Sequence, residues 1–81
     1  MTYTEAISLR LRELCRERNL SLNGMAMLAG LNQSTLENIV KGKSKSPGLR
    51  TLHRIATGLN MTVAELLDFP LMNEALFEGE S

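Results

Sequence analysis

Apolar residues recur at helical spacing along almost the whole chain. In the first stripe, Ile7, Leu11, Leu14 and Cys15 stand at i, i+4, i+7 and i+8, which places them on one face of a helix. No short segment alternates apolar and polar residues clearly enough to indicate a β-strand. The pattern therefore predicts an all-α fold.

Capping residues divide this pattern into five helices. Thr2 with Glu5, and Thr62 with Glu65, have the spacing of capping boxes, in which two residues satisfy each other's backbone N–H groups at a helix N-terminus. Gly30 is suited to the left-handed conformation that ends a helix. The predicted helices cover residues 3–18, 22–29, 33–41 and 47–58, and a short fifth helix begins after Thr62 and ends at Phe69-Pro70.

Single residues mark the other boundaries. Ser21 and Asn32 are predicted N-caps of the second and third helices, because their side-chain oxygens can accept hydrogen bonds from free N–H groups. Ser46 followed by Pro47 predicts the beginning of the fourth helix, since proline is well tolerated at the first helical position. Asn60 can supply the left-handed turn that separates the fourth helix from the fifth.

The length of the chain limits its organisation. Eighty-one residues are enough for one hydrophobic core but not for two. We expect residues 1–69 to form one domain and residues 70–81 to form a short acidic and apolar tail. The tail is compatible with two structures, a final short helix that docks on a neighbour or a frayed end.

Positive charge is concentrated away from this tail, although the net charge is zero. All nine Lys and Arg residues lie in the first 60 positions together with four acidic residues, whereas the last 21 positions hold five acidic residues and no basic one. Between Asn38 and Arg54 there are five cations and no acid. A positive field attracts polyanions, so this segment is a candidate phosphate-binding region, with a solvated surface as the alternative.

The second and third predicted helices are joined by three residues, Gly30-Leu31-Asn32. So short a connection, entered through a glycine, forces two helices to cross steeply, as in a helix-turn-helix motif. The buried side of the third helix takes its apolar residues, which leaves its polar residues on or near the outer face. The buried set is Leu36, Ile39 and Val40, and the outer set is Gln33, Ser34, Thr35, Glu37 and Asn38.

These outer side chains have the chemistry for reading DNA bases. Gln and Asn can form bidentate hydrogen bonds with adenine, and Ser and Thr can bond to several bases. Lys41, Lys43 and Lys45 follow directly and are placed for the phosphates beside the groove. Glu37 is expected to pair with Lys41, four positions later, rather than to accept a bond from cytosine.

Residues 21–42, SLNGMAMLAGLNQSTLENIVKG, resemble the helix-turn-helix of the lambda-repressor-like family, the Cro/phage-repressor and XRE group of transcription regulators. The resemblance continues through KSKSP, LRTLHRIATGLN and MTVAELL to residue 67, and so covers about 60 of the 81 positions. It implies a compact five-helix DNA-binding domain over residues 1–69. It also implies binding of double-stranded DNA, usually as a dimer, with the third helix in the major groove.

The resemblance assigns contacts to individual positions. Base contacts fall on Gln33, Ser34, Thr35 and Asn38, and a phosphate contact falls on Lys41, with Lys43 as a further candidate. Beside these, Lys45 and Ser21 are also expected to contact phosphate. Two positions depart from the family pattern. Leu22 stands where the family usually has a glutamine that touches phosphate and braces the recognition helix, and Val40 stands where an acidic or polar residue is common. One anchoring contact is therefore expected to be missing or replaced, and the packing around Val40 to differ.

The sequence lacks the residue patterns that are typical of catalytic sites, of metal binding and of phosphate-binding loops. It has no glycine-rich phosphate loop, no zinc-ligand cluster and no base in an evident relation to a Ser or Cys nucleophile. His53 is expected at the surface, and Cys15 is expected in the core. We therefore expect no enzyme activity, no cofactor, no metal and no small-molecule ligand.

The apolar residues also bear on location and assembly. No apolar run approaches the roughly 20 residues of a membrane span, no N-terminal stretch resembles a signal peptide, and the single cysteine cannot form an internal disulfide. These features predict a cytoplasmic protein without membrane contact. A homodimer is expected, because one small module offers limited area and specificity. Its contact is predicted around Leu67, Phe69, Leu71, Leu76 and Phe77.

Two functions fit these observations. The first is a sequence-specific transcriptional regulator, acting as a repressor, that reads the major groove of double-stranded DNA with its third helix at a promoter or operator. The alternative is a protein-interaction module with the same fold, such as an antitoxin-like or phage-control partner. The acidic and apolar tail is the feature that supports this alternative.

Overall fold

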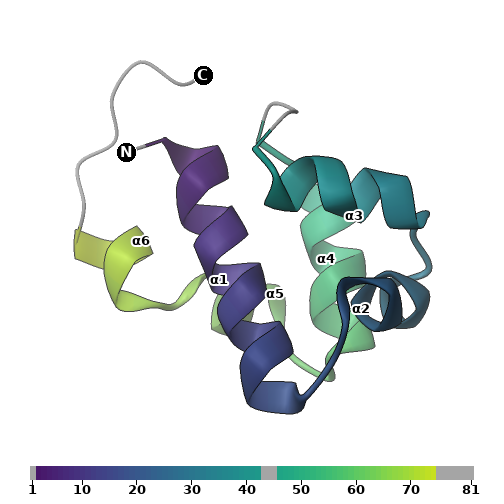
Figure 1. The fold of residues 1–81 in the computed structure, drawn as a ribbon. Coiled ribbons are helices and arrows are strands. Elements are labelled where there is room, and N and C mark those ends of the chain that lie inside the picture. Colours follow the sequence, from purple (N-terminus) through teal and green to yellow (C-terminus); the bar gives the residue numbers. More distant parts are fainter. Residues whose placement is uncertain (1, 43–45, 75–81) are drawn as a thin grey trace.

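The computed structural model describes residues 2–42 and 46–74, and within these ranges helices are joined by turns and short connecting segments, with no β-strand (Figure 1). The helices are α1 (Tyr3–Arg18), α2 (Leu22–Ala29), α3 (Gln33–Val40), α4 (Leu49–Gly58), α5 (Val63–Leu67) and α6 (Pro70–Glu74). The predicted all-α class is confirmed. The predicted number of five helices is wrong, because α6 adds a sixth among the described residues.

α6 begins at Pro70, a residue that was predicted only to end the preceding helix. Asp68 leaves α5 with φ −90° and ψ 86°, and Pro70 is then the first residue of α6. Proline lacks a backbone N–H and has a fixed φ, which disfavours a helix interior but suits the first helical position. The same residue therefore stops one helix and begins the next.

Local capping bonds fix the beginnings of α1 and α5 as predicted. The Thr2 N–H donates to the Glu5 carboxylate at 3.0 Å, and the Glu5 N–H donates to the Thr2 hydroxyl at 3.1 Å. Thr62 and Glu65 form the same reciprocal pair, at 2.9 and 3.0 Å. Asn60 adopts the left-handed conformation, with φ 59°. The predicted ranges 3–18 and 22–29 agree with α1 and α2.

Two other predicted caps differ from the structure. Asn32 occupies the N-cap of α3, but its side chain makes no capping hydrogen bond. α4 begins at Leu49 instead of Pro47, and Gly48 is its extended N-cap, with φ −73° and ψ 166°. A helix that began at Pro47 would hold Gly48 in its first turn, where ordering a glycine costs conformational entropy. Ser46 therefore lies two residues before the N-cap.

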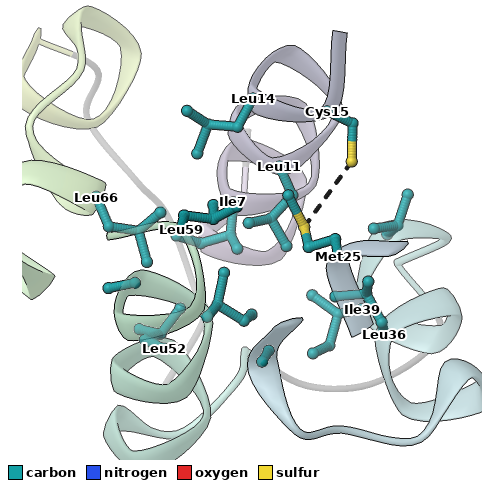
Figure 2. Close-up of a cluster of buried hydrophobic side chains, with 14 of the residues drawn as sticks. Ile7, Leu11, Leu14, Cys15, Met25, Leu36, Ile39, Leu52, Leu59 and Leu66 are labelled. Atoms are coloured by element: carbon teal, nitrogen blue, oxygen red, sulfur yellow. Dashed lines mark hydrogen bonds between the residues drawn. The ribbon is translucent and has the colours of Figure 1, made fainter. Parts of the chain in front are cut away.

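A single core connects α1 to α5. α1 packs against α3, α2 packs against α3 and α4, and α4 packs against α5. Each of these helices contributes one of the largest fully buried side chains, which are Leu11, Met25, Leu36, Ile55 and Leu66. Figure 2 shows how Leu11, Met25, Leu36 and Leu66 converge from separate helices.

Cys15 belongs to this core, as predicted. Its Sγ lies 3.9 Å from the Sδ of Met25 (Figure 2). Burial raises the pKa of the Cys15 thiol above its ordinary value, because the thiolate is poorly solvated there. The thiol therefore stays protonated at neutral pH and packs as a small apolar group.

Arg10 ties α1 to α5 and to the segment after it. Its Nε donates to the Leu66 carbonyl oxygen and its Nη2 to the Glu65 carbonyl oxygen, each at 3.0 Å. The guanidinium also lies 5.2 Å from the centroid of the Phe69 ring, in a cation–π contact. Phe69 is only 7% exposed, so it packs within its own chain. Little of the Phe69 side chain is therefore exposed for the predicted dimer contact.

The contact between α2 and α4 depends on Gly58, the last residue of α4. A Cβ atom at this position would lie 2.5 Å from the carbonyl oxygen of Leu28 and 2.9 Å from the backbone nitrogen of Ala29. Such distances are far below van der Waals contact with backbone atoms. The absence of a side chain at Gly58 therefore allows α4 to approach the end of α2, and so sets the position of α2 in the fold.

Candidate nucleic-acid interface

α2 and α3 form a helix-turn-helix through the three residues predicted to join them. Gly30 takes the left-handed conformation, with φ 68°, and the Leu31 N–H donates to the Ala26 carbonyl oxygen at 2.9 Å. Leu31 packs against the core, and Ala26 is 1% exposed. The two helices lie beside each other on the side of the molecule away from α6 (Figure 1). The glycine turn therefore places α3 at the edge of the fold.

α3 separates its apolar and polar residues as the sequence predicted. Leu36, Ile39 and Val40 are buried, and Leu36 has no exposed surface. The four predicted base-contacting residues are exposed and lie along the same helix, and they are Gln33, Ser34, Thr35 and Asn38. Among the described residues, no hydrogen bond engages the side chains of Ser34, Thr35 or Asn38.

The C-terminal end of α3 is held by α1. The Val40 carbonyl oxygen accepts a hydrogen bond from the Ser8 hydroxyl and a longer one, 3.5 Å, from Nη2 of Arg12. The positive guanidinium also offsets the partial negative charge at this helix end. The Val40 side chain is buried against the core. The apolar residue that departs from the family pattern therefore takes part in anchoring α3.

A row of polar side chains runs along the exposed side of α3. Nζ of Lys41 lies 3.8 Å from Oε2 of Glu37, which confirms the predicted pair. Gln33 also donates from Nε2 to Oε1 of Glu37, at 3.0 Å. This second bond was not predicted, although Gln33 and Glu37 have the same four-residue spacing.

The predicted phosphate-contacting residues lie at the two ends of the motif. Lys41 is the C-cap of α3 and is exposed, whereas Lys43 and Lys45 lie outside the described residues. Ser21 is the N-cap of α2, and its oxygen accepts the Gly24 N–H at 3.0 Å. The Ser21 hydroxyl proton therefore remains available for donation.

The structure also gives the exposure of the other residues named in the predictions. Leu22 is half-buried against the core, in the place where the family usually has a polar brace. His53 is exposed on α4, as predicted. Leu67 and Leu71 of the predicted dimer contact are half-buried, while Leu76 and Phe77 lie outside the described residues.

Residues 2–42 and 46–74 also bear on two other kinds of site. No three His, Cys, Asp or Glu side chains there are grouped so as to hold a metal ion. None of the helices in these ranges has the length and apolar character needed to cross a membrane.

Comparisons with known proteins agree with this geometry. The family model of the Cro/C1-type HTH DNA-binding domain matches residues 10–71. The crystal structure of the prophage Lp1 protein 11 is 40% identical, with a TM-score of 0.79, over 91% of this chain and 97% of that one. An HTH_3 family transcriptional regulator from Vibrio cholerae is 30% identical, with a TM-score of 0.74, over 89% of this chain and 38% of that one.

A curated relative from Bacillus subtilis (strain 168) bears the name "Uncharacterized HTH-type transcriptional regulator RghRB". It is 33% identical over 58 residues, which are 72% of this chain and 42% of the relative. The chain therefore spans less than half of the length of that protein.

Proposed function

Because the chain belongs to the family of Cro/C1-type helix-turn-helix DNA-binding domains, we propose that it is a sequence-specific regulator that represses transcription by occupying an operator or promoter. The observation that carries the proposal is the exposed polar side of α3. Its side chains stand on a helix whose opposite side is buried in the core. A rigid helix with exposed polar side chains is suited to the major groove of B-DNA, which admits an α-helix.

The base contacts are assigned to Gln33, Ser34, Thr35 and Asn38. All four are exposed, and three of them belong to the first turn of α3. In helix-turn-helix proteins the N-terminal residues of the recognition helix contact the base edges. Gln33 and Asn38 can each form a bidentate pair with adenine, whereas Ser34 and Thr35 can bond to more than one base.

The phosphate contacts are assigned to residues at both ends of the motif. Lys41 and the following Lys43 and Lys45 supply positive charge beyond the C-terminus of α3. Ser21 supplies a hydroxyl donor at the N-terminus of α2. Contacts of this kind fix the orientation of a protein on the duplex without reading its sequence.

The regulator is proposed to act as a homodimer, with residues 1–69 as the DNA-binding domain and residues 70–81 as part of the dimer contact. A single small module covers few base pairs, whereas two copies can read half-sites about 34 Å apart. Leu67 and Leu71 are half-buried in the monomer, so part of each side chain is left for a second copy.

The test is selection of bound duplexes from a randomised DNA library at about 150 mM salt, where nonspecific charge attraction is weakened. Enrichment of a two-fold symmetric motif with half-sites about 10 base pairs apart is the expected result. Failure of the folded protein to enrich any sequence would reject the proposal and favour the protein-interaction alternative. If a motif is enriched, Gln33→Ala should remove the base preference at one position of each half-site while the protein stays folded.

A further inference from the structure

Gln33, Glu37 and Lys41 form a connected row on the exposed side of α3. Nε2 of Gln33 lies 3.0 Å from Oε1 of Glu37, and Nζ of Lys41 lies 3.8 Å from Oε2 of the same carboxylate. The two oxygens of Glu37 therefore have different partners. One oxygen holds the amide of Gln33, and the other faces the ammonium of Lys41.

This arrangement restricts how Gln33 can present its amide. An ionised carboxylate only accepts hydrogen bonds, so Gln33 must turn its amide nitrogen, and not its carbonyl oxygen, toward Glu37. The nitrogen carries two hydrogens, and Glu37 takes one of them. One N–H donor and one carbonyl acceptor remain for a base.

That remaining pair of groups matches adenine and not guanine. In the major groove adenine presents the N7 acceptor beside the N6 donor, whereas guanine presents two acceptors, N7 and O6. A free glutamine could turn both of its N–H bonds toward guanine. A glutamine that has given one N–H to a carboxylate cannot do so without breaking that bond.

We propose that Glu37 is a positioning residue that makes Gln33 select adenine over guanine. The inference rests on the proposed function, because it requires α3 to enter the major groove. Glu37 acts through Gln33 and needs no contact with DNA. Lys41 is the third member of this row, and its ammonium offsets the negative charge that Glu37 brings close to the phosphates.

The experiment compares library selection by the wild-type chain with selection by Glu37→Ala and Glu37→Gln. The position read by Gln33 is identified as the one whose preference disappears in Gln33→Ala. At that position Glu37→Ala should lower the preference for adenine over guanine by about tenfold. Glu37→Gln should lower the preference less than Glu37→Ala does, because its amide oxygen can still accept a bond from Gln33 but its amide nitrogen can also donate one. Thermal melts followed by circular dichroism should show that all of these surface variants fold.

Two controls separate positioning from a general effect of charge. Glu13→Ala removes a carboxylate that lies 3.8 Å from Arg10 on α1, and it should leave every base preference unchanged. In a Gln33→Ala background, the further change Glu37→Ala should have no effect at the assigned position. An effect there would mean that Glu37 acts on DNA by itself, and would overturn the proposal.

The remaining outcomes distinguish this inference from the proposed function. If the wild-type chain enriches no sequence, both fail together. If it enriches a motif whose adenine preference survives Glu37→Ala, only the role of Glu37 is rejected. If Gln33→Ala leaves the motif unchanged, the base contact assigned to Gln33 is rejected together with the role of Glu37, while DNA binding by the chain stands. An equal loss of the preference in Glu37→Gln and Glu37→Ala would attribute the preference to the negative charge of Glu37 and not to the hydrogen bond that it accepts, and would also overturn the proposal.

Discussion

The two faces of α3 are built in different ways. The inner face is fixed by the rest of the molecule, because Leu36 is fully buried and the last carbonyl of the helix accepts a bond from Ser8 on α1. The outer face is organised within the helix itself, by the contacts that join Gln33, Glu37 and Lys41. Substitutions on the inner face should therefore change the free energy of unfolding, whereas those on the outer face should change DNA binding.

Leu36→Ala tests this difference most strongly. Removing a fully buried leucine side chain loses apolar contacts and leaves a cavity, so the free energy of unfolding should fall by about 2–5 kcal/mol. The neighbouring exposed residue is the matched control, and Thr35→Ala should change the free energy of unfolding by no more than about 0.5 kcal/mol. Urea denaturation measures both values. Equal losses in the two variants would contradict the division between the faces.

The fixed side of the molecule extends to the contact between α2 and α4. Gly58→Ala should lower the free energy of unfolding by about 1–3 kcal/mol, because its Cβ would meet the backbone at Leu28 and Ala29. Gly48→Ala is the matched control. A Cβ at Gly48 meets no atom within 4 Å, and φ is −73°, which any residue can adopt.

These two variants are compared by thermal unfolding. A lower melting temperature for Gly58→Ala, with little change for Gly48→Ala, is the expected result. The reverse order would show that α4 does not need a glycine to approach α2. A loss of stability in Gly48→Ala would then have to come from the change in backbone flexibility at Gly48, and not from a clash between α4 and α2.

Local interactions explain why much of this fold could be predicted from the sequence. The capping boxes at Thr2 and Thr62 join residues three positions apart, and the pair of Glu37 with Lys41 joins residues four apart. The left-handed Gly30 also acts within its own turn. Each of these features depends on neighbours that the sequence itself specifies.

The features that were not predicted depend on residues far apart in the chain. The bond from Ser8 to the Val40 carbonyl spans 32 positions, and the role of Gly58 appears only when α2 lies against α4. The cation–π contact of Arg10 with the Phe69 ring also joins residues far apart in the chain, and no local pattern predicts it. The bond between Gln33 and Glu37 is different, because the two residues are only four positions apart in the sequence. The spacing alone does not show that Gln33 bonds to Glu37.

The smallest expected effect concerns Lys41, at the edge of the outer face. If its ammonium contacts a phosphate, Lys41→Ala should make the slope of log K against log[salt] less steep by about 0.9, because one fewer counterion is released. Fluorescence anisotropy with the selected duplex, between about 50 and 200 mM salt, measures this slope. The free energy of unfolding should change by no more than about 0.5 kcal/mol, the usual contribution of an exposed pair on a helix.

Arg16→Ala is the matched control for charge. Arg16 is exposed on α1 and lines a surface depression with Phe69 and Pro70, away from the helix-turn-helix. Its removal lowers the total charge by the same amount but takes away no proposed phosphate contact, so the slope should stay unchanged. An equal change in both variants would mean that net charge, and not the position of Lys41 at the end of α3, controls the salt dependence. The charged residues of the outer face would then contribute to the salt dependence of DNA binding no more than charged residues elsewhere on the molecule, and the outer face would differ from other charged surfaces only by its base contacts.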